Sequence, residues 1–261
     1  MDRNQLEELL AFAVRLSEKA GVITLKYFPR PGSMNLTVDH KADDSPVTVA
    51  DRETEEFMRT EITKQFPDHG LFGEEFGEEK PDAETRWIID PIDGTKSFIR
   101  GVPLYGVLIG LEHRGECVLG VVHHPALGET LKGAKGLGAF WNETPARVSQ
   151  VSDPKRAMFL TTDAAVLHQI NRGFSDALCR EVKLLRTWGD CYGHTLVATG
   201  RAEAMFDALM SPWDCAALKP IIEEAGGTWT DFKGNSTIYG EDAFSTNRDL
   251  LPFIQNLLDE K

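Results

Sequence analysis

The chain has 261 residues, of which 41% are hydrophobic and 26% charged, and it carries a formal net charge of −13. This composition is typical of a globular protein, and the charge argues against a nucleic-acid binder, which needs a basic face. No apolar run approaches the roughly 18 to 20 residues that span a bilayer, and the acidic N-terminal stretch lacks the basic start of a signal peptide. We therefore expect a cytoplasmic protein without nucleic-acid or membrane partners.

Nothing in the sequence divides the chain into separate domains. We expect one domain over residues 1–261, with an N-terminal half of about 1–145 and a C-terminal half of about 146–261. The cysteines show neither a CxxC pair nor the spacing of a metal finger, which predicts reduced, half-buried thiols. They are Cys117, Cys179, Cys191 and Cys215.

Helical and strand periodicities alternate along the chain. In the first half the predicted elements are helix 4–28, helix 51–66, a short strand in 69–75, strand 86–90, two strands in 105–125 around a turn at 114–115, and a strand region in 136–149. In the second half they are strand 156–163, helix 163–180, strand 181–189, helix 191–200, strand 202–209, helix 213–226, a final strand 228–232 and a last helix 249–260. This alternation predicts an α/β fold with sheets layered between helices.

The segment DPIDGT, residues 90–95, follows a buried strand. The proline favours an extended backbone at Asp90, and Gly94 permits conformations that other residues avoid. Thr95 is then expected to cap a helix, so that the amides of Gly94 and Thr95 form an anion site at its N-terminus. The alternative is an ordinary turn that leads into a helix.

Three other segments place acids at element ends: Thr48 and Asp51 before a helix, Glu74 and Glu75 after a strand, and Asp214 after Trp213. Helix capping explains Asp51 and Asp214 equally well, because acids favour helix N-termini. If these acids converge with the carboxylates of DPIDGT, two of them about 4 Å apart repel by roughly 4 kcal/mol at an effective dielectric near 20. Either their pKa values rise or a cation binds, and oxygen-only ligands favour Mg²⁺.

The set DSPVTVAD, GEE, DPIDGTKSF and PWDCAALKPIIEEAGG resembles the inositol monophosphatase family of magnesium-dependent, lithium-sensitive phosphatases. The pieces occur in the family's order, and the resemblance covers nearly the whole chain. It implies a five-layered αβαβα sandwich, a small-molecule phosphate ester as substrate, and a homodimer.

The resemblance also implies a role for each matching position. Two or three Mg²⁺ ions would be held by Glu74, Asp90, the carbonyl of Ile92, Asp93 and Asp214. Asp51 and Thr95 would activate the attacking water, with Glu74 sharing a third ion, and Asp93 and the amides of Gly94 and Thr95 would meet the phosphate.

Substrate choice is expected to depend on residues away from the metal ligands. The WGDCYG and SPWDCAAL patterns are similar to histidinol-phosphate phosphatases of the family, and Asp190 and Asp207 suit a cationic amine. Tyr192 either stacks on the substrate ring or packs in the core. Asp190 either meets the substrate or only caps a helix, and Arg186 meets either phosphate or an acid. The histidines His194, His123 and His124 are expected to be packing or surface residues.

Three functions remain open at this point. The first is magnesium-dependent hydrolysis of L-histidinol phosphate to L-histidinol and phosphate, a step of histidine biosynthesis. The second is an inositol-1-monophosphatase or a broad-specificity sugar-phosphate phosphatase. The third is a regulatory or scaffold protein with a dead site, which the complete set of acids disfavours.

Overall fold

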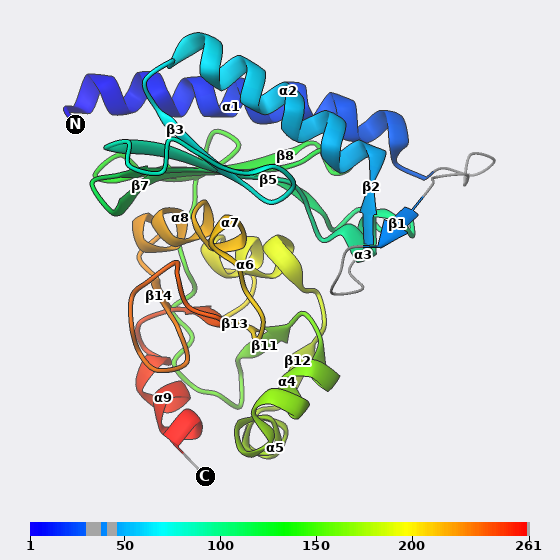
Figure 1. Ribbon diagram of the computed structural model, residues 1–261. Helices are drawn as coiled ribbons and strands as arrows, with labels where there is room; N and C mark the ends of the chain where they lie inside the picture. Colours follow the sequence, from blue (N-terminus) through cyan, green and yellow to red (C-terminus); the bar gives the residue numbers. More distant parts are fainter. Residues whose placement is uncertain (30–37, 41–45, 260–261) are drawn as a thin grey trace.

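The structure is a computed structural model that describes residues 1–29, 38–40 and 46–259. Its helices and sheets alternate in five layers, which confirms the predicted αβαβα sandwich (Figure 1). The first layer holds α1 (Arg3–Tyr27) and α2 (Val49–Gln65), close to the two helices expected there. Among the described helices, none combines the length and apolar character needed to cross a membrane.

The second layer is an eight-stranded sheet with the order β10-β9-β8-β7-β6-β5-β3-β4. Its strands are β3 (Gly70–Gly73), β4 (Gly77–Glu79), β5 (Thr85–Asp93), β6 (Gly106–His113), β7 (Glu116–His124), β8 (Glu129–Ala134), β9 (Gly138–Trp141) and β10 (Thr144–Pro145). Only β3 and β5 pair in parallel. The strands β4 and β8 were not expected from the sequence.

The third layer contains α6 (Asp190–Ala198), α7 (Pro212–Cys215) and α8 (Leu218–Glu224), which lie between the two sheets (Figure 1). The single helix predicted over 213–226 is wrong, because the chain forms two short helices there. Pro220 has no N–H to donate to the carbonyl four residues earlier, which weakens a continuous helix at this point.

The fourth layer is a five-stranded sheet with the order β12-β11-β13-β15-β14. Its strands are β11 (Met158–Thr161), β12 (Leu184–Arg186), β13 (Ala204–Asp207), β14 (Thr228–Thr230) and β15 (Ala243–Thr246). The prediction that 228–232 is the final strand is wrong, because β15 follows it and pairs with both β13 and β14. The four residues of β15 are too few to show a clear alternation.

The fifth layer contains α4 (Ala164–Ile170), α5 (Arg172–Glu181) and α9 (Leu251–Asp259). The helix predicted over 163–180 is divided at Asn171, which has φ −136° and whose side chain accepts a hydrogen bond from the N–H of Phe174. Two further elements lie near the DPIDGT segment: a hairpin of β1 (Val38–His40) and β2 (Pro46–Thr48), and the short helix α3 (Thr95–Phe98).

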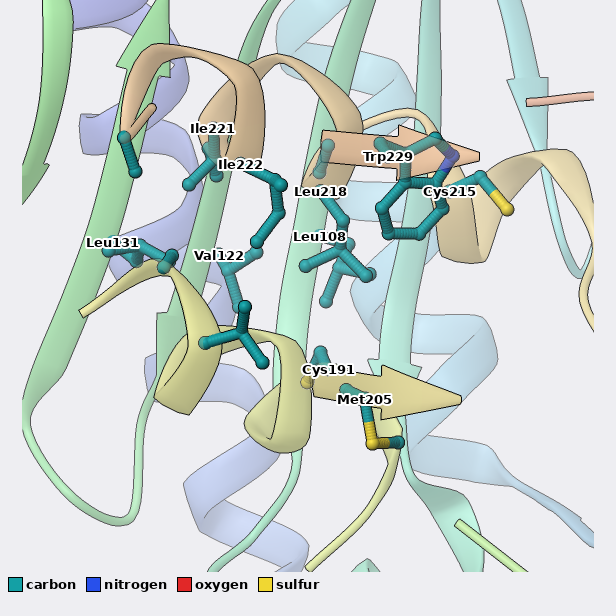
Figure 2. Close-up of a cluster of buried hydrophobic side chains, with 14 of the residues drawn as sticks. Leu108, Val122, Leu131, Cys191, Met205, Cys215, Leu218, Ile221, Ile222 and Trp229 are labelled. Carbon is teal, nitrogen blue, oxygen red and sulfur yellow. The ribbon is translucent and has the colours of Figure 1, made fainter. Parts of the chain in front are cut away.

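The central hydrophobic cluster joins the third layer to both sheets. Figure 2 shows Leu218, Ile221 and Ile222 of α8 facing Leu108, Val122 and Leu131 of the eight-stranded sheet, together with Cys191, Met205, Cys215 and Trp229. All four cysteines are free thiols, as expected. Cys179 is exposed and the other three are buried, so none of them is half-buried.

Two glycines set how closely the third layer approaches the first sheet. A Cβ on Gly120 in β7 would lie 1.9 Å from the carbonyl oxygen of Ala217, and one on Gly110 in β6 would lie 2.6 Å from the Cβ of Ala216. Residues 216 and 217 connect α7 to α8, so both glycines admit the segment that directly follows Asp214.

We expect Gly120→Ala to destabilise the protein by about 3 kcal/mol or more, because the added methyl would overlap a backbone carbonyl that cannot rotate away. Urea unfolding measures the loss. Gly133→Ala in β8 is the matched control, because its nearest atom, the Cα of Ile221, is 3.0 Å away and a small shift relieves the contact. Equal losses in the two variants would contradict this account of the packing.

Candidate active site

A β-bulge at the end of β5 brings Asp90 and Asp93 to the same face of the sheet. Asp90 pairs with Leu108 of β6, and Asp93 pairs with Gly106, so three steps along β5 match two steps along β6. In a regular strand, residues three apart point to opposite faces, and the one extra residue of a bulge cancels this. The sequence DPID therefore turns both carboxylates toward the third layer.

The chain leaves β5 through Gly94, which has φ +85° and occupies the N-cap position of α3. The expectation that Thr95 caps this helix is wrong, since Thr95 is its first residue and its Oγ1 donates to the carbonyl of Ile92 at 3.0 Å. The left-handed backbone of Gly94 suits a residue without a Cβ. It also leaves room for the carboxylate of Asp190, whose Oδ2 would lie 3.1 Å from a Cβ at this position.

A buried carboxylate of α2 shapes the turn that carries Glu74. Glu55 is fully buried and accepts hydrogen bonds from the N–H groups of Glu75 and Phe76, at 2.7 and 3.2 Å. Its charge is balanced by Arg59, whose Nε lies 2.8 Å away. A Cβ on Gly73 would lie 2.1 Å from Glu55 Oε1, so a glycine is needed directly before Glu74.

Asp214 lies in the first turn of α7 and completes a capping box with Ser211. Its Oδ2 accepts the backbone N–H of Ser211 at 2.7 Å. The predicted capping role of Asp214 is therefore confirmed. Asp51 does the same at the start of α2, where its Oδ2 accepts the N–H and Oγ1–H of Thr48 at 2.8 and 2.6 Å. In both cases one carboxylate oxygen is left for other partners.

Asp90, Asp93 and Asp214 form a cluster in which one oxygen of each lies within 4.8 Å of the others. Burial, and then the charges of Glu74 and Asp93, raise the pKa of Asp90 well above its usual value. Burial raises the pKa values of Asp93 and Asp214 to about 7. Three carboxylates cannot all stay ionised here without a cation between them.

The donor set of this cluster fits a hard divalent ion. It consists of carboxylate oxygens, and one member of it is deeply buried while the other two are partly accessible. Such ligands are those that Mg²⁺ prefers, and both thiols nearest the cluster, Cys191 and Cys215, have pKa values raised by burial, which makes them poor metal ligands.

Asp51 is a buried carboxylate with an unsatisfied atom. It is 1% exposed, and its Oδ1 makes no hydrogen bond with any described residue. Burial is the largest influence on this carboxyl and raises its pKa to about 6, with smaller contributions from the charges of Glu75 and Glu74. A buried acceptor without a partner needs a water or a ligand, and a carboxyl that titrates near neutrality suits a general base.

A cavity of about 440 Å³ opens beside the acid cluster. Among the residues that the structure describes, seven of those expected at the site line this cavity: Glu74, Asp93, Gly94, Thr95, Asp190, Asp207 and Asp214. These come from the turns after β3 and β5, from the start of α6 and α7, and from the end of β13. Both halves of the chain therefore contribute to one cavity.

Asp190 enters this cavity from an unusual backbone conformation. Its φ is +52°, and its N–H donates to Thr162 Oγ1 at 2.7 Å. The N-cap of α6 is Gly189, and no side chain caps this helix, so the alternative that Asp190 only caps it is wrong. Burial, and then the charges of Asp93 and Asp207, raise the pKa of the Asp190 carboxyl well above its usual value. A strained residue beside a cavity is typical of a functional position.

A model of the inositol monophosphatase family matches residues 5–254 of the chain. The chain belongs to this family. A histidinol-phosphatase of Chlorobaculum parvum is 49% identical over 253 residues, which cover 95% of this chain and 96% of the relative. A histidinol-phosphatase of Mycobacterium tuberculosis is 35% identical over 252 residues, which cover 91% and 93%.

The fold agrees with solved structures of the same family. The extragenic suppressor protein suhB from Bartonella henselae superposes with a TM-score of 0.89 at 28% identity, over 97% of this chain and 98% of that one. The resemblance predicted from the sequence, the fold class and the assignment as a phosphatase are thereby confirmed.

Not every residue predicted for the family's site lies at the cavity. Arg186 is exposed on β12, and its Nη1 donates to the carbonyl of Leu185 at 2.8 Å. It is absent from the described lining, so its contact with substrate stays a prediction without geometric support. Ile92 is fully buried, and its carbonyl accepts the Thr95 hydroxyl at 3.0 Å.

Tyr192 packs in the core, so the proposal that it stacks on the substrate ring is wrong. Its ring contacts His124 edge-on at 5.5 Å, and it is not among the described residues that line the cavity. His124 is fully buried and bonded to the carbonyl of Tyr105 and to Thr195, and His123 bonds to Thr130 Oγ1. These two histidines are packing residues, as expected.

Several residues of the site are not indicated by any pattern in the sequence. Thr162 fixes Asp190, Glu55 fixes the turn of Glu74, and the N–H of Cys191 donates to Asp93 Oδ2 at 2.5 Å. Lys96 is the only lysine or arginine in the described lining of the cavity. A glutamate four residues before an arginine on α2 resembles an ordinary surface pair, so no pattern in the sequence distinguishes Glu55.

Proposed function

We propose that this chain is a magnesium-dependent phosphomonoesterase that hydrolyses L-histidinol phosphate to L-histidinol and phosphate, a step of histidine biosynthesis. The observation that carries the proposal is the position of Asp190 and Asp207 in the same cavity as Asp93, Gly94 and Thr95. A phosphate held at Gly94 leaves its alcohol portion beside these two further acids. The names of the two relatives, both histidinol-phosphatases, support the same substrate.

Two carboxylates beside the alcohol favour a cationic group. Histidinol phosphate carries an ammonium and an imidazole, which can each donate to a carboxylate, whereas inositol offers neutral hydroxyls. Charge-assisted hydrogen bonds are roughly twice as strong as neutral ones. An uncharged polyol would leave Asp190 and Asp207 near Asp93 with Lys96 as the cationic side chain of the described lining, so part of their charge would stay uncompensated, which costs free energy.

The metal ligands in this proposal are Glu74, Asp90, the Ile92 carbonyl, Asp93 and Asp214, with two or three Mg²⁺ ions. When bound, Mg²⁺ supplies charge neutralisation for the phosphoryl group and lowers the pKa of a coordinated water. The close approach of three of these carboxylates and their raised pKa values support the assignment.

The chain's own residues would orient the water and the phosphate. Asp51 offers its unpartnered Oδ1 as the proton acceptor, and Thr95 aligns the water through its hydroxyl. In this structure Thr95 Oγ1 donates to Ile92, which leaves its lone pairs available to accept. Gly94 and Thr95 line the cavity, where their backbone amides would hold the phosphate oxygens.

Two further features of the proposal follow from the family resemblance: inhibition by lithium and a homodimer. Action in the cytoplasm is proposed instead from the N-terminal sequence, which lacks the features of a signal peptide. The four free cysteines support a reducing compartment.

We expect kcat/KM for L-histidinol phosphate to exceed that for inositol 1-phosphate by at least about 100-fold, because two charge-assisted hydrogen bonds would be lost with the neutral ester. Steady-state assays of phosphate release with both esters at saturating Mg²⁺ measure the ratio. The reverse preference would support the alternative, an inositol or sugar-phosphate phosphatase. No turnover of either would favour the regulatory or scaffold protein.

Asp190→Asn tests the same subsite within the chain. We expect it to weaken histidinol phosphate about 10- to 100-fold and glycerol 2-phosphate only slightly, because the amide keeps the shape of the side chain but not its charge. Equal losses on the two esters would remove Asp190 from substrate recognition.

A further inference from the structure

His194 lies between the cavity and the five-stranded sheet and makes two hydrogen bonds to residues of that sheet. Its Nε2 lies 3.1 Å from Asp207 Oδ2, and its Nδ1 lies 2.8 Å from Ser245 Oγ. His194 and Ser245 are fully buried, while Asp207 is 5% exposed. His194 and Asp207 both line the cavity. The three residues come from α6, β13 and β15, so the array ties two strands of one sheet to the helix above it.

If the imidazole of His194 is neutral, one arrangement of protons satisfies every atom of this array. The Ser245 hydroxyl donates to Nδ1, so Nε2 carries the proton of a neutral imidazole and donates it to the carboxylate of Asp207. The opposite tautomer would face a lone pair of Nε2 toward the carboxylate oxygen. The carboxylate, which can only accept, therefore sets the tautomer of His194; the Ser245 hydroxyl satisfies Nδ1, and His194 in turn orients Asp207.

The imidazole has little freedom to rotate. Its ring packs on Trp229 with centroids 5.0 Å apart, and the Trp229 Nε1–H donates to the carbonyl of Thr237 at 3.0 Å. Trp229 itself is 1% exposed. A ring held by two hydrogen bonds and a buried indole fixes its hydrogen-bond partner more tightly than a solvated side chain would.

Asp207 is bound on one side only. Its Oδ2 accepts from His194, the hydrogen-bond partner of this side chain among the described residues, and the side chain lines the cavity. The Asp207 charge also contributes to the raised pKa values of Asp93 and Asp190, so it lies near both the phosphate end and the alcohol end of the cavity. A carboxylate fixed through one oxygen presents the other in a defined direction.

We propose that His194 is a positioning residue for substrate selection: with Ser245 behind it, it holds Asp207 so that the free oxygen accepts a hydrogen bond from a cationic group on the alcohol of the phosphate ester. This inference rests on the proposed function and assigns His194 a role that packing alone does not give. It predicts that loss of the array raises KM for cationic esters and leaves KM for neutral esters unchanged.

Two variants of His194 separate its two hydrogen bonds. The amide nitrogen of glutamine can take the place of Nε2, so His194→Gln keeps the donor to Asp207 and loses the contact with Ser245. The shorter asparagine reaches the place of Nδ1, so His194→Asn keeps the contact with Ser245 and loses Asp207. Both variants lose the ring packed on Trp229, which makes each the control of the other for stability.

We expect His194→Asn to raise KM for L-histidinol phosphate about 10- to 100-fold with little change in kcat, because a hydrogen bond to a charged acceptor is lost. On glycerol 2-phosphate both variants should stay close to the wild type. On L-histidinol phosphate His194→Gln should raise KM by no more than about 3- to 10-fold, the loss expected from the Ser245 contact alone. Thermal unfolding of the two variants should show similar midpoints. Ser245→Ala should raise KM for the cationic ester by a smaller factor, about 3- to 10-fold, because it removes the hydrogen bond that holds Nδ1 and keeps the donor to Asp207.

The outcomes separate this inference from the proposed function. A wild-type enzyme with no preference for the cationic ester would overturn the proposed function. A wild-type preference that persists in His194→Asn, or an equal loss on both esters in that variant, would overturn the role of His194 alone. If His194→Asn does not fold, Ser245→Ala decides: an unchanged KM for the cationic ester then overturns the inference.

Discussion

Replacing Asp93 or Asp214 with asparagine should abolish turnover while the fold persists. Each residue offers one carboxylate oxygen to the acid cluster, and an amide neutralises the charge that holds a divalent ion. Metal ions contribute several kcal/mol of charge stabilisation in phosphoryl transfer, and each 1.36 kcal/mol is a factor of ten in rate. We therefore expect kcat/KM to fall by at least about 10³-fold in either variant.

The fold should survive because an amide oxygen can keep the local hydrogen bonds. Asp93 Oδ2 accepts the N–H of Cys191, and Asp214 Oδ2 accepts the N–H of Ser211; the oxygen of asparagine can accept both. Removal of one buried charge also relieves repulsion in the metal-free protein. The melting temperature in EDTA should therefore equal or exceed that of the wild type.

Asp163→Asn provides the matched control. Asp163 lines the same cavity, but its Oδ1 caps α4 by accepting the N–H groups of Ala165 and Val166. Asparagine caps a helix about as well as aspartate, so both stability and turnover should stay near those of the wild type. Near-normal activity in Asp93→Asn or Asp214→Asn would refute the metal assignment, whereas a large loss in Asp163→Asn would show that any acid of the cavity matters.

The sequence predicts those parts of the site whose residues lie close together in the chain. DPIDGT, GEE and the WD pair were recognisable because each combines an element end with acids, and the structure brings Asp90, Asp93 and Asp214 together. The β-bulge that turns Asp90 and Asp93 to one face was not foreseen. It depends on pairing with β6, and register between strands is a property of the sheet rather than of one strand.

The supporting residues could not be predicted, since their partners are far apart in the chain. Asp190 is fixed by Thr162, 28 positions earlier, and His194 meets Ser245, 51 positions later. On α6 alone, His194 is one polar residue on a buried face, which is ordinarily a packing residue. The strand β15 was missed for a related reason: its four residues are short, and their strand conformation is fixed by β13 and β14 on either side.

Magnesium should stabilise the protein most at alkaline pH, and the metal-free protein should become less stable as the pH rises. Burial raises the pKa values of the Asp93 and Asp214 carboxyls from 3.8 to about 7 in the folded state. Between about pH 4 and pH 7 these two carboxyls are protonated in the folded chain and ionised in the unfolded chain. Stability from these groups is therefore complete below about pH 4 and is lost as the pH rises through about 7.

Magnesium reverses this trend because it binds the ionised carboxylates. At pH 8 the carboxyls of Asp93 and Asp214 are largely deprotonated, so Mg²⁺ binding displaces few protons from them. At pH 6 each of these two carboxyls must first lose a proton, which weakens binding about tenfold per proton and pH unit. Ligand binding to the folded state alone raises the free energy of unfolding by RT ln(1 + [L]/Kd). The increase in melting temperature on adding Mg²⁺ should therefore grow from pH 6 to pH 8.

Thermal unfolding in EDTA and in excess Mg²⁺, recorded from pH 5.5 to 8.5, measures both trends. Asp93→Asn is the control, because it removes one of the shifted carboxyls and should flatten the pH dependence in EDTA as well as the gain from Mg²⁺. Turnover should disappear in excess EDTA and return when Mg²⁺ is restored. An increase in melting temperature that is equal at pH 6 and pH 8 would show that Mg²⁺ does not bind at the buried carboxylates. Binding to ordinary exposed acids, which stay ionised throughout this range, is insensitive to pH here.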